Sequence, residues 1–277
     1  MAYGLAEQGK GNDMSANVPN PLADRLARKL RNPALWQGIV GVASFFLVWQ
    51  MAKVLGFMLV MPSPIEVIAG LPRQVAQENY WLSWVASTRR VFTGFIAAAV
   101  LALVLGISMG IARKLRDTTY PILEIFRPIP PLAWLPLGIL FWPTPEMSMA
   151  FLPFMGAFFP IFINVLSGID RIDTRYIQAA RSLGSSPRTL FWRILIPGAL
   201  PSVFTGLSIA IAITWEVVIA AEMASGSLGL GYLTWNAYMN QSLVGIVIGM
   251  LSIGVAGMIS SALTAWVGTV AMPWRRA

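Results

Sequence analysis

Among the charged side chains that lie inside or at the ends of long apolar segments of this 277-residue sequence, four are candidates for function: Arg89, Arg90, Glu216 and Glu222. A charge in the hydrocarbon core of a membrane is costly, so such residues are functional candidates by default. Arg89 and Arg90 could attract an anion toward a passage, or they could simply extend their aliphatic stems to the lipid–water interface. The chemistry open to these residues is the binding and release of ions.

The two carboxylates suggest different roles. Glu216 lies within an apolar segment, so we expect it to form a structural ion pair with Lys53 or one of the two arginines; a gating role is the alternative. Glu222 could contact a partner protein or shape an outer gate, or it could belong to an ordinary loop. Trp134, which stands among several prolines, is a further candidate for lining a path.

The sequence contains no cysteine and no histidine, which excludes thiol nucleophiles, disulfides, Ser-His-Asp triads and histidine-ligated metals. It also lacks the GxxxxGK[ST] loop through which many proteins bind ATP. The glycines of residues 226–232 (GSLGLGY) are a weak nucleotide signal, because no strand precedes them. We therefore expect no enzyme activity and no cofactor in this chain.

Composition indicates a membrane protein. The chain is 56% hydrophobic and 12% charged, whereas a soluble domain carries about 25% charged residues. Apolar segments long enough to cross a bilayer predict an all-α protein with six transmembrane helices, at residues 34–60, 86–112, 120–142, 147–168, 200–221 and 243–271. Five prolines from Pro128 to Pro143 predict a kinked or broken third span, and Pro153 and Pro160 predict interruptions in the fourth.

The basic residues predict the orientation. With both termini in the cytoplasm, 16 of the 20 lysines and arginines fall on the inner side, and Arg73 is the clear basic residue of an outer loop. The net charge of +8 is then explained by this bias, without nucleic acid as a partner. Outer loops are expected at residues 61–85 and 222–241, and a basic cytoplasmic loop at 113–127.

Residues 1–32 are expected to form a cytoplasmic tail, and residues 33–277 a single transmembrane domain. Leu22, Leu26 and Leu30 share one helical face opposite basic residues, which predicts a helix at 21–31 lying on the membrane surface. A solvated helical leader is the alternative. No cleavable signal peptide is expected, because the first long apolar segment begins only after residue 32.

A polar segment at residues 170–197 separates the fourth and fifth apolar segments. Tyr176–Leu183 contains no helix breaker, and Gly184 can adopt the positive φ that ends a helix. Ser186 before Pro187 predicts the start of a second helix, which is expected to break at Pro197. A compact helix–Gly–helix segment with small residues on one side suits docking into a partner's groove; the alternative is an ordinary amphipathic loop.

This segment resembles the coupling loop of ABC importer permeases, in which Glu-Ala-Ala is followed by three residues, Gly, nine residues, Ile, one residue and Leu-Pro. The spacing is kept here, with Gln178 in place of the Glu and Ile196 in place of the Leu. The resemblance implies that an ATPase docks on the following residues: Gln178, Ala179, Ala180, Leu183, Gly184, Ile194 and Pro197.

Further stretches extend the resemblance over about residues 60–271. They are Ser87–Gly94 (STRRVFTG), Arg127–Pro136 (RPIPPLAWLP), Phe204–Gly206, Ala221–Met223 and Gly229–Tyr232, and they resemble the nitrate/sulfonate/bicarbonate group of ABC importer permeases. The resemblance implies a type I, MetI-like permease in a bacterial inner membrane. It also implies a small oxyanion as solute: nitrate first, with bicarbonate, taurine and alkanesulfonates as alternatives.

The same resemblance implies three kinds of partner protein. These are two cytoplasmic ATP-binding subunits that hold ATP and Mg, a second permease copy, and an extracytoplasmic solute-binding protein.

Two alternative functions remain open. A self-sufficient secondary transporter or channel would be expected to show internal repeats and ion-coupling carboxylates. A non-transporting membrane anchor would explain the docking segment but not the proline-broken helices.

Overall fold

The computed structural model describes residues 33–57, 60–226 and 228–276, and every regular element within these ranges is a helix. The chain divides into two compact units, Met1–Leu59 and Val60–Ala277. The first unit contains α2 (Pro33–Val54), which corresponds to the expected first span but ends at Val54 instead of residue 60. The expected tail at 1–32 and its helix at 21–31 lie outside the described residues.

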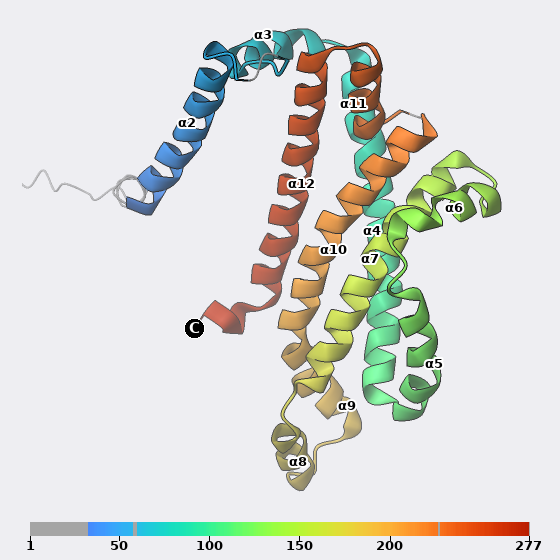
Figure 1. The fold of residues 1–277 in the computed structure, drawn as a ribbon. Helices are drawn as coiled ribbons and strands as arrows, with labels where there is room; N and C mark the ends of the chain where they lie inside the picture. Colours follow the sequence, from blue (N-terminus) through green and yellow to red (C-terminus); the bar gives the residue numbers. More distant parts are fainter. Residues whose placement is uncertain (1–32, 58–59, 227, 277) are drawn as a thin grey trace, which may run out of the picture. The chain divides into compact units, whose positions relative to one another are not determined.

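The second unit is built on long helices joined by shorter ones (Figure 1). The long helices are α4 (Glu78–Ile111), α7 (Pro145–Asp170), α10 (Ile196–Ser225) and α12 (Leu243–Ala271). The shorter elements are α3 (Pro64–Val75), α5 (Arg113–Phe126), η1 (Pro131–Trp134), α6 (Leu135–Phe141), α8 (Thr174–Ser182), α9 (Pro187–Leu190), the π-helical η2 (Phe191–Leu195), α11 (Leu230–Met239) and η3 (Pro273–Arg276).

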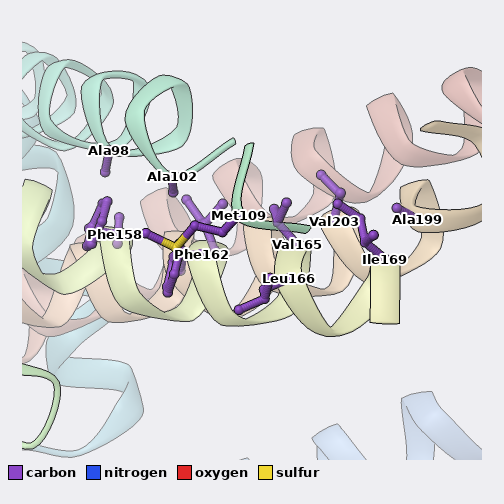
Figure 2. Packing of buried hydrophobic residues seen from close by; sticks show 13 residues of the cluster. Ala98, Ala102, Met109, Phe158, Phe162, Val165, Leu166, Ile169, Ala199 and Val203 are labelled. Carbon is purple, nitrogen blue, oxygen red and sulfur yellow. The ribbon is translucent and has the colours of Figure 1, made fainter. Parts of the chain in front are cut away.

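Helix α7 lies between α4 and α10 and forms the centre of this unit. Figure 2 shows Phe158 and Phe162 of α7 beside Ala98 and Ala102 of α4, all of them buried. Small residues let the helix backbones approach closely, which is how helices associate in a membrane, where burial of apolar surface gives little driving force. At Gly206, for example, a Cβ would lie 2.7 Å from the Cβ of Asn164.

Five helical runs of the described residues are long and apolar enough to cross a membrane. A sixth crossing results when α5 and the η1–α6 pair, bent by 87° at the prolines, are counted as one broken span. This agrees with the six-span, all-α expectation, and the predicted break in the third span is confirmed. Residues 113–127, expected as a cytoplasmic loop, instead form α5, because Tyr120 and Leu123 pack against the core.

Three other expectations were wrong in detail. Pro153 and Pro160 do not interrupt α7, which continues through both residues to Asp170. Residues 61–85 are largely helical, because Ser63 and Glu66 form a capping box at the start of α3 and Pro64 occupies its first position. Residues 222–241, expected as an outer loop, contain the end of α10 and the whole of α11.

Candidate functional site

A cluster of ion pairs and hydrogen bonds, buried except at Glu146, joins α4, α7, α10 and the start of α11 at the end of the unit opposite α8. We call Ser87, Arg90, Glu146 and Glu222 the charge cluster. Arg90 of α4 is 2% exposed, and its Nη1 lies 2.8 Å from Oε1 of Glu222, which is fully buried. Its Nε and Nη2 donate to the two carboxylate oxygens of Glu146, and Nη1 also donates to the carbonyl of Leu228. The guanidinium is thus held by two carboxylates from α7 and α10.

Glu222 is satisfied by more than its ion pair. The hydroxyl of Ser87 donates to its carboxylate at 2.8 and 2.9 Å, and the backbone N–H of Gly231 donates at 2.9 Å. The Ser87 hydroxyl in turn accepts from the N–H of Leu230 at 2.8 Å. A buried charge requires this many partners, since desolvation otherwise exceeds the Coulombic gain. The cluster therefore fixes the α10–α11 connection onto α4.

The glycines of the GSLGLGY stretch have a structural explanation in this arrangement. A Cβ on Gly229 would collide with the Glu222 carboxylate, and a Cβ on Gly231 would collide with the carbonyl oxygen of Ile219. These residues allow the backbone to wrap around a buried carboxylate.

The charged residues that we expected along a path do not lie together in the structure. Arg89 is 64% exposed and pairs with Glu146 at 2.9 Å, at the edge of the charge cluster. Glu216 is exposed on α10, and the described residues include no ion-pair partner for it. The expected pairing of Glu216 with Arg89 or Arg90 is therefore wrong, because both arginines pair with carboxylates nearer the end of the bundle.

Trp134 is half-buried in η1 and packs against a small core cluster formed by α7 and α10. Its ring lies 6.0 Å from that of Phe126 and 6.5 Å from that of Phe151, measured between centroids. Glu146 and the Ser87 hydroxyl were not singled out from sequence. A carboxylate directly after a Pro-Thr-Pro turn gave no local sign that it would face Arg90, and only tertiary contacts bring the two together.

At the other end, residues 174–190 form a segment that projects beyond the bundle (Figure 1). Asp173 caps α8 by accepting from the N–H of Arg175 at 2.8 Å. Gly184, at φ 76°, ends α8 as expected, and the Ser186 hydroxyl accepts from the N–H of Thr189 at the start of α9. The helix–Gly–helix form expected of this segment is present.

The outer surface of α8 is open and partly apolar. Gln178 and Ala179 are exposed, Ala180 is half-buried, and Leu183 is 86% exposed.

Ile194 and Pro197 are half-buried at the base of this segment, where the chain enters α10. The helical break expected at Pro197 is absent. The π-helical η2 (Phe191–Leu195) leads directly into α10, and its wider turn accommodates the carbonyl of Arg193, with which the Pro197 ring would otherwise clash.

Comparisons with known proteins agree with this geometry. Residues 98–276 match the family model described as "Binding-protein-dependent transport system inner membrane component". The chain is 32% identical to a nitrate import permease protein of Synechocystis over 263 residues, covering 92% of this chain and 94% of the relative. It is 30% identical to a bicarbonate transport system permease protein of Synechococcus elongatus, over 82% of this chain and 86% of that protein.

Among solved structures, the chain is similar to the MetNI methionine ABC transporter in inward-facing conformations. The TM-score is 0.51 with 22% sequence identity, over 68% of this chain and 93% of the matched chain. At this identity the likeness extends to the fold alone.

Proposed function

This chain belongs to the family of binding-protein-dependent transport system inner membrane components, and on that premise we propose that it carries a small oxyanion, with nitrate the first candidate. It is a multi-pass membrane permease subunit of an ABC importer, and ATP is hydrolysed by separate subunits. Nitrate is proposed because a nitrate import permease aligns over 92% of the chain, and bicarbonate is the next candidate.

The observation that carries the coupling role is the open surface of α8. Gln178, Ala179, Leu183 and Gly184 are exposed and Ala180 is half-buried, in the second half of α8 and directly after it. This form suits insertion into a groove on an ATPase subunit. Ile194 and Pro197, at the base of the segment, then pass its movement to α10 through η2.

We place the α8 end in the cytoplasm, in a bacterial inner membrane, with both termini on the same side. Basic residues support this orientation, since Arg175, Arg181, Arg188 and Arg193 all fall in the projecting segment or at its base. The α11 end then faces an extracytoplasmic solute-binding protein. Two ATP-binding subunits, carrying ATP and Mg, and a second copy of this permease would complete the transporter.

The five side chains expected along the path divide into two groups. Arg89 and Glu216 are exposed, and we retain them as path residues. Arg90, Glu222 and Trp134 are buried or packed, and we assign them to holding the path's walls in place. Transport by alternating access then requires the ATPase pair to move α8, and α10 to transmit that movement to the opposite end.

The test is purification of the tagged chain in mild detergent, identification of the co-purifying proteins, and reconstitution of the complex in vesicles. Two ATP-binding subunits and two permease copies are expected. ATP hydrolysis should rise with a binding protein loaded with nitrate more than with one exposed to bicarbonate, taurine or an alkanesulfonate. Uptake by the permease without any ATPase would contradict the proposal and favour a secondary transporter.

A further inference from the structure

A hollow of about 390 Å³ lies beside the break in the third span. Arg127, the residue that caps α5, lines it together with the middle of α7, from Met155 to Asn164. Ile209 and Ile213, from the middle of α10, close another side. The hollow is thus bounded by the midpoints of two membrane-spanning helices and by the proline-rich break.

Arg127 is exposed and lies well along the bundle from the α8 end. Arg116, near the start of α5, pairs with Asp170 at the α8 end of α7 at 2.8 Å, so α5 begins at that end of the bundle. The 14 residues of α5 then carry the chain about 21 Å along the bundle (Figure 1). With the α8 end placed at the cytoplasmic surface, as proposed above, Arg127 stands inside the hydrocarbon core, which is about 30 Å thick. On this placement Arg127 does not belong with the cytoplasmic basic residues.

An arginine at this depth carries a large desolvation cost and indicates a role. Among the described residues no carboxylate pairs with Arg127, and its side chain makes no hydrogen bond. This contrasts with Arg90, whose guanidinium is fully occupied by protein groups. The donors of Arg127 are available to a ligand that enters the hollow.

Asn164 adds an oriented amide to the same wall. One of its N–H groups donates to the carbonyl of Pro160 at 2.8 Å, which fixes the side chain and leaves its second N–H unused by that bond. The remaining lining is mostly apolar. A planar guanidinium and a fixed amide that line one largely apolar hollow suit a small planar oxyanion, which can accept two parallel N–H···O bonds from the guanidinium.

We propose that Arg127, assisted by Asn164, binds the transported oxyanion halfway through the membrane. This inference rests on the proposed function, since it assigns the anion to a particular point of the same path. The proline-rich break is what allows it: α5 ends in mid-membrane, and irregular backbone is tolerated at that depth where it lines a cavity. Broken helices near the midplane are where transporters commonly bind their solutes.

The main test uses the complete transporter in vesicles, with permease, ATPase subunits and binding protein. Arg127→Gln should reduce nitrate uptake about tenfold, the loss expected for a charged hydrogen bond. Nitrate-loaded binding protein should still stimulate ATP hydrolysis, because the docking surfaces are intact. Arg127→Lys should retain more uptake than Arg127→Gln. Arg113→Gln, which removes an exposed arginine from the start of the same helix, is the matched control and should leave uptake unchanged.

The outcomes separate the two proposals. If the unaltered transporter moves no oxyanion, the proposed function fails and this inference fails with it. If it moves nitrate and Arg127→Gln moves nitrate equally well, the inference alone is overturned.

A second measurement keeps Arg127 in place, in case its replacement prevents assembly. Because the chain has no cysteine, Ile213→Cys introduces a unique thiol into the wall of the hollow. A negatively charged methanethiosulfonate should modify it faster than a positively charged one, relative to an exposed reference thiol at Ser182→Cys, and nitrate should slow the reaction. If the thiol of the Ile213→Cys variant shows no preference for the negative reagent and no protection by nitrate, the inference is overturned.

Discussion

At the scale of single residues, the two adjacent arginines of α4 have opposite surroundings. Arg90 is buried and paired with two carboxylates, whereas Arg89 is mostly exposed and shares one of them. A buried pair adds little net stability, but removing one partner leaves an uncompensated charge. The adjacent residues therefore form a natural comparison of a structural charge with an exposed one.

Arg90→Gln should destabilise the protein by about 3–5 kcal/mol, because Glu222 would remain buried without its ion pair. Arg89→Gln should cost less than about 1 kcal/mol, as for an exposed pair. The measurement is thermal unfolding of the detergent-purified protein. Equal shifts in the two variants would contradict the structural role assigned to Arg90.

At the scale of elements, α8 is exposed on the side that the coupling role requires, and its backbone continues through α9 and η2 into α10. Docking depends on the small side chain at Ala180, which leaves room for a partner surface.

Ala180→Glu should reduce the ATP hydrolysis stimulated by the loaded binding protein at least about tenfold, the effect of losing roughly 1.4 kcal/mol of docking energy. The unfolding temperature of the isolated permease should stay unchanged, since surface substitutions usually alter stability by less than about 0.5 kcal/mol. Thr174→Glu adds the same charge at the first residue of α8, where it favours the helix, and is the control. Undiminished stimulation in Ala180→Glu would contradict docking through this face.

The sequence predicted the elements whose signals are local. Apolar length located most of the spans, and Gly184 and Ser186 marked the ends of the short helices in the projecting segment. It did not predict α11, because that helix is held by a carboxylate nine residues earlier, at Glu222. It also did not indicate that Arg127 would line a hollow together with α7 and α10, because only the packing of α5 against the core brings it there.

At the scale of the whole second unit, the charge cluster and the projecting segment lie at opposite ends of α7, with the hollow between them. This order matches the tasks of an importer: a surface for the binding protein, a passage, and a surface for the ATPase. In the proposed orientation, the projecting segment lies in the cytoplasm and the charge cluster lies on the extracytoplasmic side.

The orientation of the chain in the membrane can be measured in intact cells by thiol labelling, because any introduced cysteine is unique in this chain. Asn240→Cys, exposed after α11, should react with a membrane-impermeant thiol reagent added outside, once the outer membrane is permeabilised. Ser182→Cys, exposed at the end of α8, should react only after the inner membrane is opened. The reverse pattern would invert the proposed topology.

The uninterrupted passage from α9 through η2 into α10 has a mechanical consequence. Residues Pro187–Ser225 form one helical run of 39 residues, about 58 Å long and nearly twice the thickness of the hydrocarbon core. A helical run that tilts as one body about a contact near its middle moves its two ends in opposite directions. Opening at one membrane surface and closure at the other are then a single displacement. The passage is therefore never open to both sides of the membrane at the same time.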